Sequence, residues 1–138
     1  MVRINLLNPQ QLSDQHLVAE YLEIIMLTAY VRKYPRLNNI PEKYTLGQGH
    51  IKFFKNKLRY LQQRHELLKL EMRQRGFKAR VKLNLQQIPS HLFNNWQPQK
   101  EDYKIIRQRI NEKLKKKPYF YRYYGEHRPL HFFQQLLA

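Results

Sequence analysis

The fold is decided in residues 13–34, which read SDQHLVAEYLEIIMLTAYVRKY. Side chains suited to a core recur here at steps of three and four, as on the buried face of an amphipathic helix; they are Leu17, Tyr21, Ile24, Ile25 and Thr28. Ser13 can cap the helix start, and Asp14 in the first turn complements the helix dipole. Because Pro35 ends the pattern, we expect a helix over residues 13–34.

Two further helices follow from the same signals. Residues 45–75 carry a second stripe, with Thr45 as the capping residue and Gly76 as the stop. The side chains that this stripe would bury are Phe53, Phe54, Leu58, Leu61, Leu68 and Met72. Residues 101–116 begin with acids and end with lysines before Pro118, which matches the dipole at both ends. Basic residues dominate the 45–75 helix, so we expect its outer face to be strongly positive.

The remaining segments are less regular. Residues 78–100 contain two prolines and the single tryptophan, which is typical of a long ordered loop, and the alternation at residues 80–85 is compatible with a short strand. An aromatic, basic tail follows residue 118. We therefore predict an all-α protein whose residues 1–138 form a single compact domain of three main helices with long ordered loops.

Composition indicates the class of partner. The 138-residue chain has 26 Lys plus Arg against 10 Asp plus Glu, a formal net charge of +16, which for a folded domain indicates a polyanion binder. The absence of cysteine excludes disulfides and thiolate nucleophiles, and the six histidines lack the spacing of a zinc site. Since no apolar run is long enough for a membrane span, we expect a cytoplasmic protein that joins the nucleoid when bound to DNA.

A series of short sequence blocks resembles one enzyme family in the same order along the chain. The first block is MVRINL at residues 1–6, followed by DQHL at 14–17 and AEY at 19–21 with Glu23 close behind. The later blocks are VRK at 31–33, LGQGH at 46–50, FF at 53–54, KL at 57–58, RGF at 75–77, RINEK at 109–113 and YRYYG at 121–125. Together they resemble the pyrimidine-dimer DNA glycosylase/AP lyases over nearly the whole chain.

The resemblance implies a fold and an activity. The fold would be all-helical, with the N-terminal segment threaded between the first and third main helices. Members of the family cut the glycosidic bond of a damaged base in duplex DNA and then nick the abasic site. The nucleophile would be the α-amine of Val2, exposed by removal of Met1, and Glu23 would be the catalytic carboxylate.

The resemblance also implies DNA-binding residues and marks two departures. Arg3, Arg109 and Lys113 match positions near the DNA phosphates, and His16 matches a histidine close to the site. The family carries arginines where this chain has Leu22 and Met26, and threonine is common where it has Val2. These departures bear on the choice of lesion, whereas the chemistry asks only for a primary amine and a carboxylate.

The chemistry that the resemblance implies suits these residue types. Loss of a base leaves an electron-poor C1′, which a carboxylate such as Glu23 stabilises. An α-amine has a pKa near 7.7 to 8.0, so a useful fraction is unprotonated at neutral pH and can form an imine with C1′. β-Elimination of the 3′ phosphate then follows proton removal from C2′. No metal or cofactor is required.

Residue patterns by themselves leave alternatives open. Glu23 alone would be read as a solvated helix acid, and Glu20 as a structural acid bonded to a basic neighbour or as a group that raises the pKa of Glu23. His16 is either a site residue or a helix-surface histidine. The glycines at residues 47 and 49 could bind a phosphate or only begin a helix.

The aromatic tail is open in the same way. Tyr121, Arg122 and Tyr123 either contact DNA, with the rings stacking on extruded bases, or cover the core. The leading function is a DNA-repair glycosylase with AP lyase activity, acting as a monomer on double-stranded DNA without membrane or metal. The alternatives are the same chemistry on a different modified base and a non-catalytic, basic nucleic-acid-binding protein.

Overall fold

The computed structural model describes residues 3–138 and is built almost entirely of helices. In chain order the elements are the short 3-10 helix η1 (Pro9–Gln11), α1 (Asp14–Lys33), α2 (His50–Phe54), α3 (Leu58–Gln74), the short 3-10 helix η2 (Ser90–Leu92), α4 (Lys100–Lys116), the hairpin strands β1 (Arg122–Tyr123) and β2 (Glu126–His127), and α5 (Leu130–Leu137). The predicted all-α class is confirmed, and α1, α3 and α4 are the three main helices.

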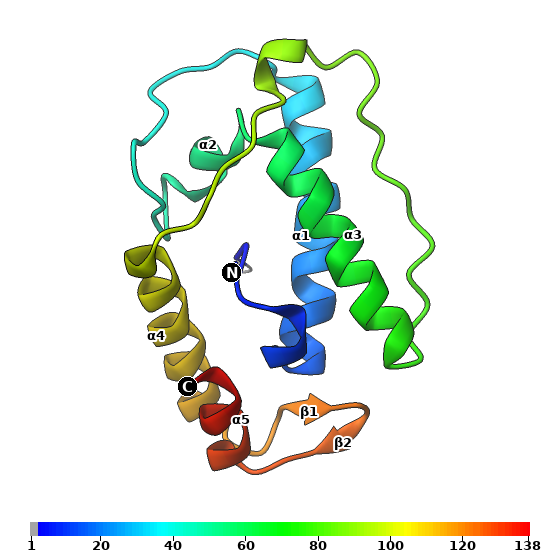
Figure 1. Ribbon diagram of the computed structural model, residues 1–138, viewed down its shortest axis with the longest axis vertical. Coiled ribbons are helices and arrows are strands. Elements are labelled where there is room, and N and C mark those ends of the chain that lie inside the picture. Colours follow the sequence, from blue (N-terminus) through cyan, green and yellow to red (C-terminus); the bar gives the residue numbers. More distant parts are fainter. Residues whose placement is uncertain (1–2) are drawn as a thin grey trace.

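The N-terminal segment lies between the helices. Figure 1 shows α1 and α3 side by side, α4 apart from them, and the start of the chain in the space between. Its side chains are deeply buried, with Ile4 0% and Leu7 1% exposed. The predicted threading of this segment is therefore confirmed, and it places the start of the chain against α1 and α4.

The first helix begins and ends as its sequence predicts. Ser13 Oγ accepts a hydrogen bond from the backbone N–H of His16 at 3.1 Å, which caps α1. Leu17, Tyr21 and Ile24 are at most 3% exposed. The stripe that these residues form packs against α3. The other side of α1 is therefore free of α3 and can contact other parts of the molecule.

The single helix predicted over residues 45–75 is wrong, because the structure divides it into α2 and α3. Asn56 and Lys57 are held by the loop before α4: Asn94 Nδ2 donates to the Asn56 carbonyl at 2.8 Å, and Lys57 forms a β-bridge with Phe93. Thr45 does not cap a helix, since its hydroxyl donates to the Leu46 carbonyl. The predicted stop is correct, because Gly76 has φ +84° and Phe77 N–H bonds the Met72 carbonyl at 2.8 Å.

The outer face of residues 45–75 is less positive than predicted. Four of its basic side chains are buried, namely Lys55, Arg64, Lys69 and Arg75. Arg64 donates from Nε to Glu20 Oε2 at 2.6 Å and from Nη2 to Oε1 at 2.9 Å, so it forms a two-point ion pair with a carboxylate that is 0% exposed. Packing of α3 on α1 brings these charges inside, where each must be paired.

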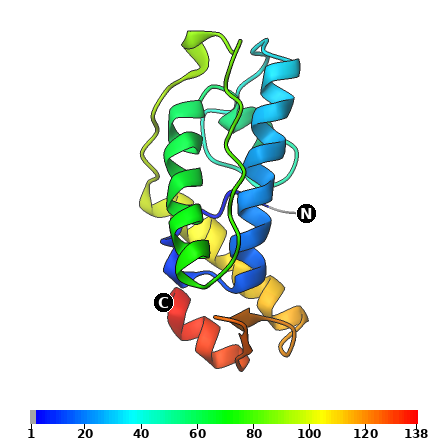
Figure 2. The ribbon, with the colours of Figure 1, turned by 90° about the vertical axis from the view of Figure 1, so that its right-hand side faces the viewer.

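Residues 78–100 form the predicted long ordered loop, but residues 80–85 are not a strand. The backbone N–H and C=O groups there form hydrogen bonds with side chains, and not with a neighbouring strand. Val81 N–H donates to Tyr21 Oη at 3.0 Å, Arg73 donates to the Ala79 carbonyl at 3.0 Å, and Arg32 donates to the Asn84 carbonyl at 2.8 Å. We call residues 78–85 the strap; Figure 2 shows it running lengthwise beside α1 and α3.

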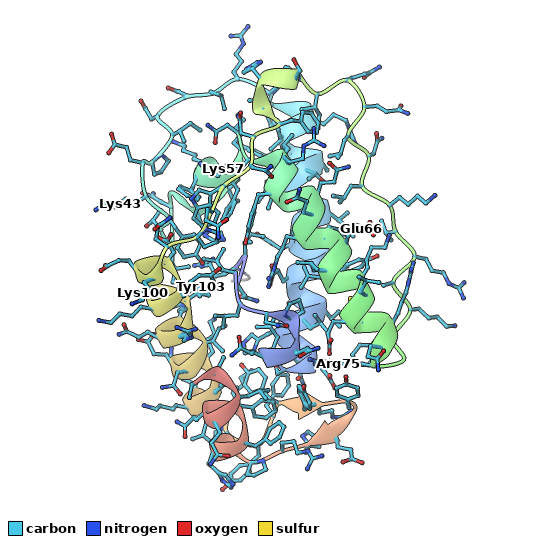
Figure 3. The ribbon with its side chains drawn as sticks, in the orientation of Figure 1. Lys43, Lys57, Glu66, Arg75, Lys100 and Tyr103 are labelled. Carbon is cyan, nitrogen blue, oxygen red and sulfur yellow. The ribbon has the colours of Figure 1, made fainter. Side chains whose placement is uncertain are left out.

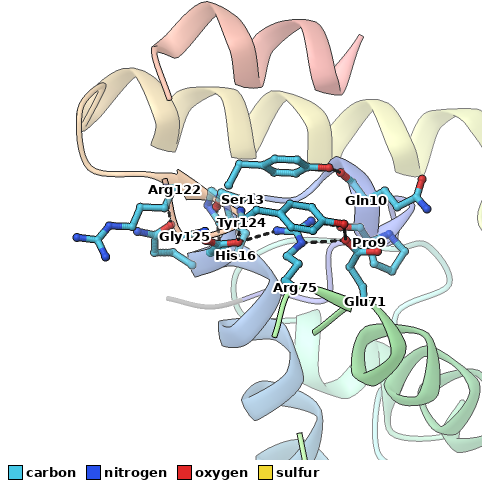
Figure 4. A network of polar contacts seen from close by, with 12 residues as sticks. Pro9, Gln10, Ser13, His16, Glu71, Arg75, Arg122, Tyr124 and Gly125 are labelled. Atoms are coloured by element: carbon cyan, nitrogen blue, oxygen red, sulfur yellow. Dashed lines mark hydrogen bonds and ion pairs between the residues drawn. The ribbon is translucent and has the colours of Figure 1, made fainter. Parts of the chain in front are cut away.

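The C-terminal tail has more structure than predicted. Tyr124 and Gly125 form a tight turn with φ of +54° and +80°, and their N–H groups donate to the Asp14 carboxylate at 3.1 and 2.7 Å. Arg75 bonds Asp14, Glu71 and the Pro9 carbonyl, and so ties the turn to α1 and α3 (Figure 4). Residues 130–137 then form α5, which packs on α4.

Candidate active site

The position of the N-terminal segment is set by two side chains from residues 44–50. The backbone N–H of Ile4 donates to His50 Nε2 at 3.0 Å, and Tyr44 Oη donates to the Ile4 carbonyl at 2.8 Å. His50 Nδ1 lies 2.9 Å from the Thr45 carbonyl. Burial lowers the pKa of His50 to about 4, so the ring is neutral and can accept from Ile4 at Nε2 while donating from Nδ1.

A pocket of about 210 Å³ lies between this segment, α1, α4 and the turn after α4. Five of the predicted site residues line it, namely Arg3, His16, Arg109, Lys113 and Tyr121. The other lining residues are Asn5, Gln15, Ala19, Ile106, Ile110 and Phe120. Residues from both ends of the chain therefore meet at one concave site.

The pocket is positively charged and holds an unused donor. Arg3 and Arg109 are close enough that the pKa of Arg3 is lowered by burial and then by the charge of Arg109. Arg109 Nε is buried and has no hydrogen-bond partner among residues 3–138, and its only ion pair there is a 3.9 Å contact to Glu112. Buried donors are normally satisfied, so this guanidinium is suited to an anionic ligand such as a phosphate.

Glu23 lies on α1 one turn beyond the pocket residue Ala19. Its carboxyl is half-buried, and burial raises its pKa above the ordinary value, against the opposing effect of the Arg3 charge. The mutual effect of Glu23 and Arg3 places the carboxylate near the start of the chain. A half-buried carboxylate beside a positive pocket can stabilise a developing positive charge on a bound ligand.

The two glutamates of α1 occupy different environments. Glu20 is fully buried in its ion pair with Arg64, which also donates to the Leu7 carbonyl. The interpretation of Glu20 as a structural acid bonded to a basic neighbour is confirmed. Glu23, in contrast, retains access to solvent and forms no ion pair within residues 3–138, so it is the acid available to a ligand.

His16 is a wall of the pocket and not a surface histidine. Its ring stacks on Tyr121 with centroids 4.8 Å apart, and Nδ1 lies 2.9 Å from Ser13 Oγ. Burial, and then the charge of Lys113, lower the pKa of His16 to about 4, so the ring is neutral at pH 7. Because Ser13 Oγ already accepts the capping N–H, its O–H is available to donate to Nδ1, which leaves the proton on Nε2.

Not every predicted residue reaches the pocket. Arg122 lies on the exposed hairpin, where Nε bonds His127 at 3.1 Å, and the Tyr123 ring covers the Arg75 guanidinium at 4.4 Å. Val2, the predicted nucleophile, lies outside the described residues. Tyr44 and His50 were not predicted as site residues, although the LGQGH block at residues 46–50 marks the neighbourhood of His50.

The apolar departures Leu22 and Met26 are surface residues. Leu22 is 50% exposed and Met26 66% exposed, one on each side of Glu23 in sequence. Neither side chain is part of the hydrophobic core. The surface around Glu23 is therefore apolar where Leu22 and Met26 lie and positive where Arg3 lies.

The described residues hold neither a metal centre nor a membrane-spanning helix. No group of three or more His, Cys, Asp or Glu in residues 3–138 is arranged to hold a metal ion. None of the helices in that part of the chain combines the length and the apolar character that crossing a bilayer requires.

Comparison with protein families gives one match. Residues 1–85 match the family Pyr_excise, described as pyrimidine dimer DNA glycosylase. The matched residues include Arg3, His16 and Glu23, whereas Arg109, Lys113 and Tyr121 lie beyond them. The match covers more than half of the 138 residues, so the chain belongs to the pyrimidine dimer DNA glycosylase family.

Proposed function

We propose that this DNA glycosylase is bifunctional: it excises a damaged pyrimidine from duplex DNA and then cleaves the abasic strand by β-elimination through an imine on its N-terminal amine. The observation that carries the proposal is the positive pocket lined by Arg3, Arg109 and Lys113, which reaches Ala19 on α1, one helical turn from Glu23. Arg3 is covalently next to Val2, whose Cα is only about 3.8 Å from that of Arg3 in any trans conformation.

The proposed first step is base release. The amine of Val2 attacks C1′, the glycosidic bond breaks, and the base leaves with the bonding electrons. Glu23 stabilises the positive charge that develops on C1′ and the ring oxygen. The nearby positive charge of Arg3 disfavours protonation of the amine, which keeps more of it nucleophilic.

The proposed second step is strand cleavage. The amine loses its proton, the C1′–O4′ bond opens with a proton going to O4′, and an imine forms. A base then removes a proton from C2′, and the C3′–O bond breaks so that the 3′ phosphate leaves. Arg109 and Lys113 are assigned to the DNA phosphates, because the pocket presents one unused buried donor and two further cations.

We propose the whole chain as one catalytic domain that acts as a monomer, because the pocket takes residues from both ends of the sequence. A second candidate, the same chemistry on a different modified base, is favoured by the exposed Leu22 and Met26 beside Glu23. Unlike arginines, apolar side chains at these two positions cannot bind phosphates. The substitutions would therefore change which damaged base the protein holds at the pocket.

Borohydride trapping tests the proposal. Duplexes carrying a cyclobutane pyrimidine dimer, a panel of modified bases or an abasic site are incubated with protein lacking Met1, reduced, and mapped by peptide mass. We expect a covalent adduct on residue 2 with the dimer and with the abasic site, and none with undamaged DNA.

The controls separate the alternatives. A protein extended by one residue at its N-terminus should form no adduct, since its amine is displaced by about 3.8 Å. An adduct on a lysine, or strand cleavage without an adduct, would refute the N-terminal nucleophile. Trapping with another modified base but not the dimer would select the second candidate, and no reaction with any duplex would indicate a non-catalytic binder.

A further inference from the structure

A second positive pocket lies between α3 and the strap. Its volume is about 390 Å³, and it is lined by Gln62, His65, Glu66, Lys69, Arg73, Lys82, Leu83 and Leu85. It shares no lining residue with the candidate active site. The strap and the labelled Glu66 lie on the side of α3 away from α4 (Figures 2 and 3), whereas the candidate active site is lined in part by residues of α4.

The charge of this second pocket is positive and partly buried. Lys69, Arg73 and Lys82 contribute three cations against the single acid Glu66. The Lys69 side chain is only 8% exposed, and its one ion pair within residues 3–138 is a 3.5 Å contact to Glu66, whose own side chain is 65% exposed. A buried ammonium has three donors, so Lys69 has capacity for a further anionic partner.

His65 supplies an independent indication of a ligand. It is 1% exposed and stacks on Tyr21 with centroids 4.8 Å apart, yet its Nε2 has no hydrogen-bond partner among residues 3–138. A buried polar atom without a partner is uncommon in a folded protein. As a lining residue of the pocket, His65 can donate from an Nε2–H to an anion without carrying a charge itself.

The pocket is preformed. Tyr21, Arg73 and Arg32 bond the backbone of the strap at Val81, Ala79 and Asn84, so the wall that carries Lys82 is held at three points. A ligand therefore meets a site that is already ordered, and it does not have to supply the free energy of ordering the loop.

We propose that this pocket binds a backbone phosphate of a second segment of nucleic acid while the active-site pocket is occupied. Three cations and a neutral donor around one cavity are the groups that recognise a phosphate. Exposed Lys78 and Arg80 extend the positive surface along the strap, as a polymer would require and a free phosphate would not. The binding does not depend on the chemistry at Glu23.

Nuclear magnetic resonance on the full chain tests the site directly. The protein is first saturated with a short duplex containing a non-cleavable abasic-site analogue, and then titrated with inorganic phosphate or with an eight-residue oligothymidylate. We expect the resonances of the His65 ring and of the Lys69 and Lys82 amides to shift on addition of the oligonucleotide. The oligonucleotide concentration needed should be about one tenth of the inorganic phosphate concentration that gives the same shifts. Equal responses would assign the pocket to free phosphate, and no response at His65 would refute it.

A matched pair of variants tests the bridging role. Arg73→Gln combined with Lys82→Gln should lower capture of a second labelled duplex about tenfold, and Lys82→Gln alone should lower it in the same direction. Lys33→Gln combined with Arg36→Gln removes the same formal charge at exposed positions outside both pockets and should lower capture by no more than about twofold. Equal losses in the two double variants would refute the pocket.

Cleavage of a short duplex gives the independent readout. It should remain at the parental rate in all of these variants, because none of the substituted residues lies at the active site. Failure of capture with normal cleavage would overturn only this inference. Normal capture with no imine trapping would overturn only the proposed function.

Discussion

The ring of His50 holds the start of the chain in place: its Nε2 accepts the backbone N–H of Ile4 at 3.0 Å, although the two residues are 46 positions apart. Tyr44 completes the clamp by donating to the carbonyl of the same residue. Arg3, the first described residue, is thus positioned by side chains that do not line the candidate active-site pocket. The 44–50 segment therefore fixes the position of Ile4 and, through it, of the neighbouring Arg3.

His50→Leu should therefore separate cleavage from binding. It leaves the buried N–H of Ile4 without a partner, which costs about 1 to 3 kcal/mol of stability, and it frees the N-terminal segment to shift. A shift of about 1 Å at the reacting groups lowers the cleavage rate on the order of 10²-fold, whereas the phosphate contacts assigned to Arg109 and Lys113 on α4 remain, so DNA affinity falls by much less. Single-turnover nicking and DNA titration measure the two effects.

The control for this variant is His131→Leu, on the exposed side of α5. It should leave both the cleavage rate and the affinity unchanged. If His50→Leu also cleaves at the parental rate, the clamp on Ile4 does not position the reacting groups.

Glu23→Gln should abolish chemistry and preserve binding. The variant removes the negative charge near Arg3 while keeping the size of the side chain, so affinity for DNA holds or rises. The cleavage rate falls on the order of 10²-fold or more, because the transition state loses its stabilising carboxylate. Glu101→Gln, at an exposed position in the first turn of α4, is the matched control and should cleave normally.

Glu20→Gln should act on folding and not on catalysis. Without the charge of Glu20, the guanidinium of Arg64 remains buried and uncompensated, which costs about 3 to 5 kcal/mol. The expected result is a large fall in the unfolding free energy, measured with urea, and a near-parental cleavage rate for the folded fraction. A stable but inactive variant would assign the catalytic acid to Glu20.

Arg109→Ala and Lys113→Ala should each flatten the salt dependence of DNA binding. Each removes one phosphate contact, so the slope of log affinity against log salt should change by about one unit. Arg107→Ala, on an exposed side of α4 outside the pocket, should change it by much less. Unchanged slopes for both pocket variants would place the DNA on another surface.

Acid should destabilise the protein through three buried histidines. Burial lowers the pKa of His16, His50 and His65 to about 4, against an ordinary value of 6.5. The unfolded chain then binds more protons than the folded chain between these values, so stability is fully present above about pH 6.5 and is lost as the pH falls towards 4. The raised pKa of Glu23 acts in the opposite direction.

Urea unfolding at pH 7 and pH 4.5 measures this loss, which is on the order of 1 to 3 kcal/mol for each histidine. His50→Leu should show a smaller pH dependence than the parent, and His131→Leu the same dependence as the parent. Equal stability of the parent at the two pH values would contradict the neutral, buried state of the three rings.

Local sequence determined the parts of this protein whose signals lie within a few residues of one another. The cap at Ser13, the three- and four-residue spacing through α1 and the glycine stop after α3 each involve hydrogen bonds or packing inside one helix, so they can be read without the rest of the chain. The order of the sequence blocks likewise pointed to the family and to Glu23.

The tertiary structure decided whatever depends on partners far along the chain. The break between α2 and α3 follows from the contact of Asn94 with Asn56, and the turn after β1 is held by Asp14. Burial of Arg64 also depends on a distant partner, Glu20, and the position of Ile4 depends on His50. Each of these buried polar groups needs a hydrogen-bond partner that only the folded chain supplies. Sequence named Arg3, His16 and Lys113, but packing of the N-terminal segment between α1 and α4 is what brings them to one pocket.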